Sequence, residues 1–455
     1  MKHLVVIDVV GLTPALLGEH TPHLNLLIDQ GFRANLDPVA PAVTCTAQAT
    51  MLTGTLPREH GIVANGWYFR DLAEVWFWRQ SNHLVHGEKV WDAARRSVEG
   101  FDCAQLFWWY NMYAAVEYAV TPRPIYPADG RKIPAIYSHP AGLQGELERD
   151  LGPFPMFNFW GPAADIRSSE WIARCARWVF DQHRPRLQLV YLPHLDYNLQ
   201  RLGPGDPRIW EDVRAIDRVA GELIQHVRAA GAEAMVVSEY GIEPATAAVP
   251  INRILREHGY IAVRETLGFE LLDYGASRAF AVADHQVAHV YAREPADLPA
   301  VAKLLAAVPG IERVLGEEGK AELGLDHPRS GELVAIAEPG CWFSYYYWLD
   351  DAKAPDFART VDIHRKPGYD PVELFVDPDL KSPQLKIAFR LLQKKLGLRM
   401  LMDVIPLKPE LVKGTHGRVH ASPEHNPLLI SSRRDLAVDR LPMAGVKAMI
   451  LRHLA

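Results

Sequence analysis

The chain has 455 residues, with 49 Lys and Arg against 55 Asp and Glu, which gives a formal net charge of −6 at pH 7. This balance argues against a nucleic-acid polymer as partner, because such binders carry a basic face that neutralises phosphates. The content of 48% hydrophobic and 23% charged residues is typical of a globular protein and excludes a disordered chain, a collagen or a coiled coil.

The cysteines and the N-terminal segment bear on the cellular compartment. Cys45, Cys103, Cys175 and Cys341 form no CxxC pair, so the sequence predicts neither a zinc knuckle nor a disulfide framework. Asp8 interrupts the first apolar stretch, which argues against a signal peptide, and no run approaches about 20 apolar residues. We therefore expect a cytoplasmic protein without a membrane partner. The oligomeric state is not readable from the sequence.

Three short apolar runs are typical of buried strands, and acidic residues follow them at Asp8, Asp196 and Glu239. The carboxyl ends of parallel strands meet at one edge of a sheet, so these side chains are expected to converge. Clustered carboxylates repel one another unless a proton or a divalent metal neutralises them. For each residue alone, a turn or cap carboxylate is the alternative. The runs are residues 4–7, 187–192 and 234–237, and helical patterns lie near 21–31, 171–180 and 216–227.

The remaining regions interrupt this pattern. Residues 101–165 are rich in aromatics and prolines and are predicted to form a cap, while 246–375 are predicted to be a second insertion or an extension of the sheet. The helical stretch 382–397 carries four basic residues and is predicted to be a solvated basic face. The catalytic core is then expected from residues 1–100, 166–245 and 376–455.

A cluster of small hydroxylated residues begins at Thr44, just before a probable helix. It is compatible with an ordinary helix start, because Ser and Thr are preferred caps. A hydroxyl at a helix N-terminus beside metal-binding acids is also how a nucleophile for phosphoryl transfer is built.

Five N-terminal elements together resemble the alkaline phosphatase superfamily, and within it the nucleotide pyrophosphatase/phosphodiesterase-like branch. Later anchor points extend the resemblance to roughly half of the chain. The elements are Val6-Ile7-Asp8, Thr21-Pro22-His23-Leu24, Pro41-x-x-Thr44, Ala49-Thr50-Met51-Leu52-Thr53-Gly54 and Pro57-x-x-His60-Gly61-Ile62-x-x-Asn65, and the anchors surround Asp196, Glu239 and His416.

The resemblance implies an α/β fold, a three-layer sandwich with a largely parallel central sheet and an inserted cap region. It implies that Thr44 is the nucleophile, that Asn65 donates to a phosphate oxygen, and that Cys45 lines the leaving-group pocket. For one or two divalent cations (zinc, manganese or magnesium), it implies that Asp8 and Thr44 belong to one metal site and Asp196 and His416 to the other. Gln200, Glu239 and Tyr240 stand at the remaining ligand positions.

Three of these ligand positions depart from the family pattern. The resemblance predicts imidazoles where this sequence has Gln200 and Tyr240, and an Asp where it has Glu239. Because imidazole suits zinc and oxygen ligands suit harder ions, the changes argue against an ordinary di-zinc centre. A recast site for a harder metal, a site with one metal and a degenerate site are the three alternatives. Six other histidines are candidates for replacement ligands, namely His194, His285, His289, His364, His420 and His425.

The sequence thus predicts a metal-dependent hydrolase of a small phosphoester or other anionic substrate, of phosphodiesterase or pyrophosphatase type, acting through a phospho-threonine. One alternative is a non-catalytic homologue that binds an anionic ligand at a degenerate metal site. Another is a hydrolase of phosphonate or sulfate esters, because fold does not fix substrate. The substrate itself is not encoded in any motif that we can read.

Overall fold

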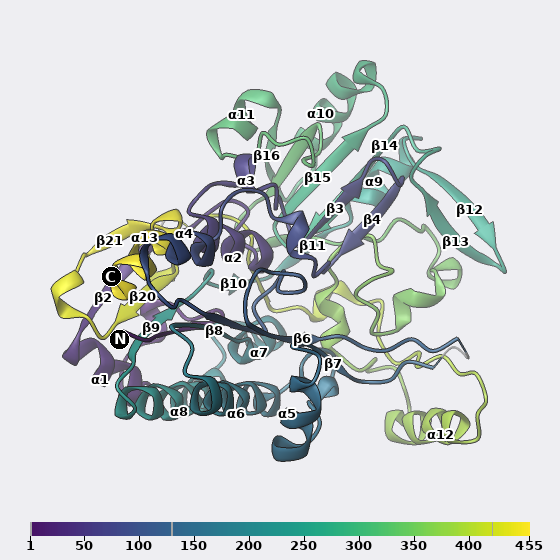
Figure 1. The fold of residues 1–455 in the computed structure, drawn as a ribbon. Coiled ribbons are helices and arrows are strands. Elements are labelled where there is room, and N and C mark those ends of the chain that lie inside the picture. The colour runs from purple at the N-terminus through teal and green to yellow at the C-terminus, as the bar shows by residue number, and fades with distance from the viewer. Residues whose placement is uncertain (1, 129–130, 421) are drawn as a thin grey trace.

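A nine-stranded sheet runs through the computed structural model, which describes residues 2–128, 131–420 and 422–455 (Figure 1). Five neighbouring strands, from β9 to β6, are parallel, and antiparallel pairings flank them on both sides. In spatial order the strands are β21 (Arg440–Pro442), β2 (Phe32–Asp37), β20 (Leu428–Ser431), β9 (Glu233–Val237), β1 (Leu4–Val9), β8 (Leu187–Leu192), β5 (Cys103–Leu106), β6 (Tyr118–Pro122) and β7 (Ile136–His139).

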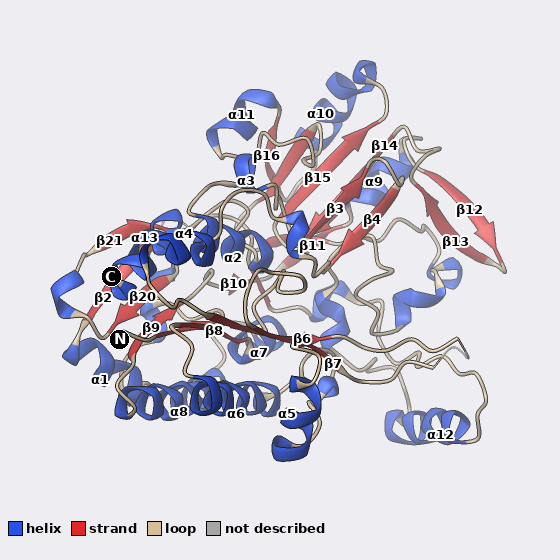
Figure 2. Ribbon diagram, viewed as in Figure 1, coloured by secondary structure: helices blue, strands red, loops and turns tan. Residues whose placement is uncertain are grey.

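The central strands are apolar on both faces because helices cover both sides of the sheet (Figure 2). Val5 and Ile7 of β1 face one cluster, and Leu4 and Val6 face the other. The first face is covered by α1 (Pro22–Gln30), α6 (Ile166–His183) and α8 (Ile209–Ala229), and the second by α2 (Thr44–Thr53), α4 (Val90–Ser97) and α13 (Val446–Leu454). The expected three-layer α/β sandwich is confirmed.

A second, antiparallel sheet follows in the chain and lies beyond β3 (Gly66–Phe69) and β4 (Glu74–Phe77) (Figure 1). Its strand order is β14 (Ala279–Asp284), β15 (Val287–Ala292), β17 (Leu333–Ala337), β16 (Ile311–Leu315). Its apolar core includes residues of α9 (Ile251–Glu257) and α10 (Leu298–Ala306). The loop after β14 reaches the edge of the main sheet where the acidic residues gather.

Shorter elements complete the fold. They are α3 (Pro57–His60), α5 (Leu143–Leu151), α7 (His194–Leu202), α11 (Glu317–Glu322), α12 (Pro383–Lys395), β10 (Glu243–Pro244), β11 (Ala247–Val249), β12 (Ala262–Thr266), β13 (Phe269–Asp273), β18 (Cys341–Phe343) and β19 (Gly414–Thr415). The interval 101–165 contributes β5, β6 and β7 to the main sheet, so it is continuous with the core rather than only above it. The division into core, cap and second insertion stays a prediction. Within the described residues, no helix is long and apolar enough to cross a membrane.

Candidate active site

Thr44 is the first residue of α2, and its side chain lines a cavity of about 600 Å³. All ten residues of this helix are buried, so the polar side chains among them need partners inside the protein. The Thr44 hydroxyl lies 3.1 Å from the hydroxyl of Tyr240, which in turn donates a hydrogen bond to Asp196 Oδ1 at 3.3 Å. Three residues that are distant in the sequence therefore form one hydrogen-bonded chain.

Asp8 and Glu239 are brought together by Gln48, one helical turn after Thr44. The Gln48 amide nitrogen donates to Asp8 Oδ2 at 3.0 Å and to Glu239 Oε1 at 2.7 Å. Its carbonyl oxygen accepts from the backbone N–H of Trp109 at 2.7 Å, which fixes the direction of the amide. The other oxygens, Asp8 Oδ1 and Glu239 Oε2, are buried and have no hydrogen-bond partner among the described residues. Two buried acceptors without a hydrogen-bond partner thus remain in this group, although neither residue lines the cavity itself.

Asp196 belongs to a second group, in the first turn of α7. The Gln200 side chain donates to Asp196 Oδ2 at 2.6 Å and is held from the other side by the hydroxyl of Tyr369, 3.1 Å from its Oε1. His416, directly after β19, places Nε2 3.9 Å from Asp196 Oδ1, while its Nδ1 lies 2.8 Å from the carbonyl of Ala42. The carbonyl bond assigns the proton to Nδ1 and leaves a lone pair on Nε2.

Burial decides the protonation of these groups. It raises the pKa of Asp8 from 3.8 to about 7, although hydrogen bonding with Glu239 and then with Gln48 opposes the rise. It raises the pKa of Asp196 equally, to about 7, and that of Glu239 well above its usual range, where the Asp8 charge adds to the effect. Burial also lowers the pKa of His416 to about 3, so this imidazole is neutral. Tyr240 stays a phenol, because burial and then the Asp196 charge raise its pKa.

The side chains near Thr44 offer oxygen donors to a ligand. Among the residues that the structure describes, no three His, Cys, Asp or Glu side chains form a group able to hold a metal. The orphaned oxygens of Asp8 and Glu239, with the Thr44 hydroxyl, nevertheless offer hard oxygen ligands, and Gln48 orients both carboxylates from behind. The second set is poorer, because the amide N–H₂ of Gln200 already faces Asp196.

Asn65 and Cys45 lie beside Thr44 but are engaged with each other. The side-chain oxygen of Asn65 accepts the backbone N–H of Cys45 at 2.9 Å, and its amide nitrogen donates to Asp284 Oδ1 at 3.1 Å. The Cys45 side chain is buried in an apolar cluster with Trp67 and Tyr110, and it does not line the cavity. The two residues therefore fix the start of α2 in this structure.

Two of the six candidate histidines line the same cavity as Thr44, namely His285 and His364. His285 follows β14 and stacks between His416 and Tyr369, with ring centroids 3.6 and 3.7 Å away. Burial lowers its pKa well below 6.5, so it too is neutral. The remaining four do not line this cavity: His194 lies 2.9 Å from Asp212, His289 is 3.0 Å from the Val63 carbonyl, and His420 and His425 lie near each other.

Three further residues of the site, Gln48, Asp284 and Tyr369, are not among those predicted from the sequence. Gln48 had a usable signal, because a residue four positions after a helical nucleophile lies on the same face of the helix. Asp284 and Tyr369 come from the second sheet and a later loop, and no spacing relates them to Thr44.

Comparisons with known proteins identify the relatives of this site. The sequence matches the family of type I phosphodiesterases and nucleotide pyrophosphatases over residues 4–370. An uncharacterized pyrophosphatase/phosphodiesterase of Schizosaccharomyces pombe is 27% identical over 250 residues, which cover 51% of this chain and 41% of that protein. This chain thus matches only about two fifths of the length of that relative.

Two solved structures share the fold at low identity. Phosphonoacetate hydrolase from Sinorhizobium meliloti 1021, in complex with phosphonoformate, has a TM-score of 0.64 and 14% identity, with 100% of this chain and 96% of that chain covered. Murine ectonucleotide pyrophosphatase/phosphodiesterase 5, in an inactive form with AMP, has a TM-score of 0.59 and 14% identity, with 100% and 95% covered. Together with the family match, they confirm the resemblance found in the sequence. The chain belongs to the type I phosphodiesterase/nucleotide pyrophosphatase family, a family of phosphoester hydrolases.

Proposed function

We propose that this chain hydrolyses a small phosphoester of the phosphodiester or pyrophosphate type, with Thr44 as the nucleophile. The observation that carries the proposal is the place of the Thr44 hydroxyl, which lines the cavity at the N-terminus of α2 beside the unpartnered oxygens of Asp8 and Glu239. A helix N-terminus favours an anion, so a phosphoryl group that reaches Thr44 meets a positive end of the helix dipole.

The hydrogen-bonded chain from Thr44 through Tyr240 to Asp196 gives the nucleophile a route for its proton. As the bond from Thr44 Oγ1 to phosphorus forms, the bond from phosphorus to the leaving oxygen breaks. The Thr44 proton passes to the Tyr240 oxygen while the Tyr240 proton passes to Asp196 Oδ1. The leaving group takes a proton from solvent. Water then attacks the phosphorus of the phospho-threonine and the bond from phosphorus to Thr44 Oγ1 breaks. Asp196 returns its proton through Tyr240 to Thr44 Oγ1, and the phosphate product keeps the protons of the water. In this scheme Tyr240 carries the proton where the family pattern predicts an imidazole.

We further propose that the reaction depends on a divalent metal. Asp8, Glu239 and Thr44 would hold one hard cation, with Tyr240 at the edge of the set, and Asp196, Gln200 and His416 would form a weaker second set. A cation bound there offsets the carboxylate charges and lowers the pKa of the Thr44 hydroxyl. The oxygen-rich set supports magnesium or manganese over zinc.

The test compares the wild type with T44A on nitrophenyl esters of phosphate, phosphodiester, phosphonate and sulfate, with magnesium, manganese or zinc added in turn. We expect T44A to lose about a thousandfold or more in kcat/KM. Thr46→Ala is the matched control, because the Thr46 hydroxyl lies two residues further on and bonds the Ile62 carbonyl instead. Full activity in T44A overturns the nucleophile, and equal losses in both variants indicate damage to α2.

The rival functions predict different results in the same assay. A non-catalytic binding protein turns over none of the esters with any metal, yet still binds an anion such as phosphate. A phosphonate or sulfate ester hydrolase turns over those esters faster than the phosphodiester. Elemental analysis of the wild type and of Asp8→Asn shows whether a metal is retained through Asp8 and which one it is.

A further inference from the structure

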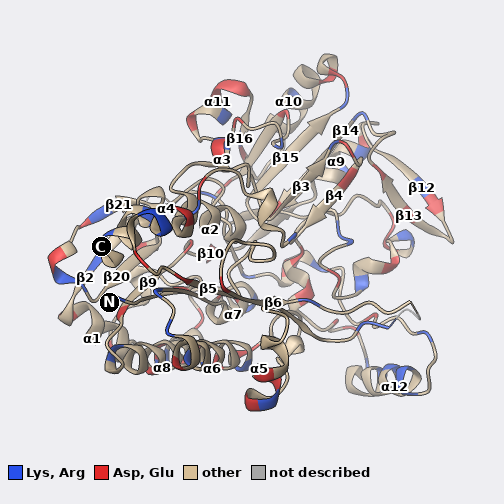
Figure 3. Ribbon diagram, in the orientation of Figure 1, with Lys and Arg blue, Asp and Glu red and all other residues tan. Residues whose placement is uncertain are grey.

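The segment from residue 380 to residue 402, which includes α12, differs in charge from the rest of the chain. It contains six basic residues and no acidic one, whereas the whole chain carries a net charge of −6. Figure 3 shows blue but no red along α12, which projects from the body of the molecule below the loops after β6 (Figure 1). The basic residues are Lys381, Lys386, Arg390, Lys394, Lys395 and Arg399.

An apolar stripe of α12 faces solvent. Leu385, Phe389 and Leu392 of the helix, and Leu396 that caps its C-terminus, are 71, 57, 51 and 66% exposed. Their spacing of four, three and four residues places them on one side of the helix. Leu398 just beyond the helix is also exposed, at 57%. Solvated helices present polar side chains outward, so this stripe is unpartnered apolar surface of a kind that marks an interaction site. The helix therefore exposes an apolar face in addition to the predicted basic one.

The opposite side of α12 lines the cavity that contains Thr44. Ile387, Leu391 and Lys394 contribute to its wall, and so do Met400 and Met402 after the helix. The cavity thus extends from the nucleophile to the inner side of an exposed amphipathic helix. Most of its lining is apolar, from Trp78, Trp109, Phe159, Trp160, Val361, Ile363 and Val404 among others.

Other exposed apolar residues border the same cavity. Tyr126 and Phe157 line it and are 58 and 69% exposed, and Ile125 and Ile133 beside them are 53 and 37% exposed. Together with the exposed side chains of the 380–402 segment they make up more than half of the large hydrophobic side chains that are exposed in the described chain. We call the four exposed residues of the α12 stripe named above, with Tyr126 and Phe157, the apolar rim.

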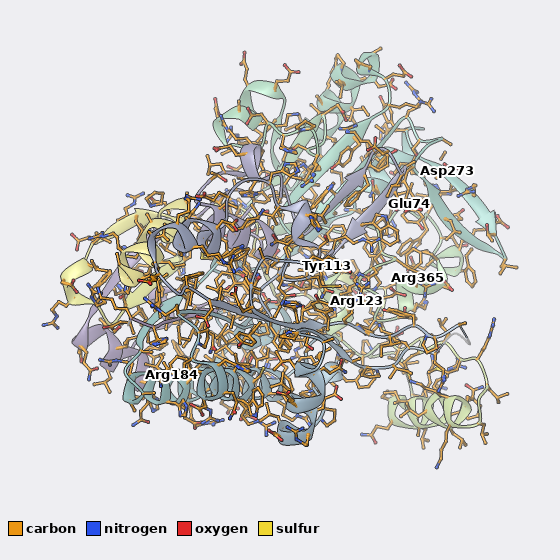
Figure 4. All side chains as sticks on the ribbon, in the orientation of Figure 1. Glu74, Tyr113, Arg123, Arg184, Asp273 and Arg365 are labelled. Carbon is orange, nitrogen blue, oxygen red and sulfur yellow. The ribbon has the colours of Figure 1, made fainter. Side chains whose placement is uncertain are left out.

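Four of the six basic side chains of the 380–402 segment form no ion pair in the described chain. Lys386 and Arg390 both pair with Asp403, at 2.9 Å each. In the part of the chain that the structure describes, Lys381, Lys395 and Arg399 form no ion pair or side-chain hydrogen bond, so their charges remain available. Lys132 and Lys394 line the cavity. Arg365, labelled in Figure 4, is paired with Asp362 and Asp356 and adds no free charge.

We propose that the apolar rim docks on the surface of a bilayer that contains anionic lipid, with the basic residues of the 380–402 segment facing the lipid headgroups. An amphipathic helix with apolar and basic faces binds the membrane interface without spanning it. The expectation of no membrane partner rested on the absence of a membrane-spanning stretch. Docking on the membrane surface does not need such a stretch. If the proposed function holds, the substrate is an amphiphilic phosphoester, with its phosphate at Thr44 and its apolar chain along the cavity toward α12.

The docking is tested without catalysis, by flotation of the purified full chain with vesicles. One vesicle set is phosphatidylcholine alone, and the other is phosphatidylcholine and phosphatidylglycerol in a seven-to-three ratio. We expect binding to the anionic vesicles to be tighter by on the order of a hundredfold, and to weaken with salt. A variant with L385D, F389D and L392D is expected to lose this binding. The matched control is L267D, because Leu267 is 92% exposed but lies on the distant β12–β13 turn.

Each outcome decides the proposal. The proposal is overturned by equal binding of both vesicle types, by no binding, or by binding that the α12 changes do not affect. It is also overturned if the wild type forms a dimer that the α12 variant does not form, because the rim then binds a second copy of the chain. A circular dichroism spectrum like that of the wild type shows that the variant is folded. Activity separates the two proposals. Hydrolysis of a soluble phosphodiester without vesicle binding refutes only the docking, and vesicle binding without any hydrolysis refutes only the function.

Discussion

Replacing Gln48 by Leu removes the side chain that links the two carboxylates of the candidate site. Leu has a similar size, so the change leaves little empty space in α2. It does leave three buried groups without their partner, namely Asp8 Oδ2, Glu239 Oε1 and the backbone N–H of Trp109. The variant therefore isolates hydrogen bonding at the site from packing.

The expected loss of stability follows from those three groups. A buried polar group left unsatisfied costs about 1–3 kcal/mol, so three of them cost about 3–9 kcal/mol. The lower half of this range is expected, because burial already raises the pKa of Asp8 to about 7 and of Glu239 above its usual range. Both carboxylates then take up protons more easily when the amide is lost. We expect a decrease of about 3–6 kcal/mol in the free energy of unfolding at pH 7, which is large beside a total of about 5–15 kcal/mol.

Urea unfolding, followed by tryptophan fluorescence and circular dichroism, measures this loss. Gln188→Leu is the matched control, because Gln188 is equally buried in β8 but makes one side-chain hydrogen bond, to the Ala176 carbonyl at 3.0 Å. That control is expected to cost about 1 kcal/mol. The reasoning is refuted if Gln48→Leu destabilises the protein no more than Gln188→Leu with the same dependence on urea.

Two other predictions concern buried charges and protons away from the nucleophile. Lys366 forms ion pairs with Asp370 and Glu373 at 2.7 Å each in a fully buried cluster. Lys366→Met is therefore expected to lower the free energy of unfolding, measured with urea, by about 3–5 kcal/mol. A loss below about 1 kcal/mol contradicts this. Burial lowers the pKa of His289 from 6.5 to about 4, and its Nδ1 accepts the N–H of Gly331. The contribution of the neutral imidazole to the free energy of unfolding is therefore complete above pH 6.5 and declines as the pH falls toward 4. His289→Gln is expected to make the pH dependence of the free energy of unfolding between pH 6.5 and 5 shallower, by up to about 1.4 kcal/mol per pH unit. Urea midpoints measured across that pH range check this, and an unchanged slope contradicts it.

The sequence contained enough to predict the fold and most of the candidate site. Apolar runs without alternation require a sheet covered on both faces, and the structure places β1, β8 and β9 side by side as that pattern predicts. Acidic residues near the ends of these strands had to meet at one edge. Asp8, Asp196 and Glu239 do meet there, although Asp8 lies within β1 and Asp196 within α7 rather than beyond the strands.

Tertiary structure alone decided how those residues are connected. Gln48 joins Asp8 to Glu239 because α2 starts beside the sheet edge, and no local pattern encodes a contact between residues 191 positions apart in the chain. The exposure of α12 is likewise invisible in the sequence, since the same leucine spacing serves a helix that is packed and one that is not. Periodicity specifies which residues share a face, and only the packing of distant segments decides what that face meets.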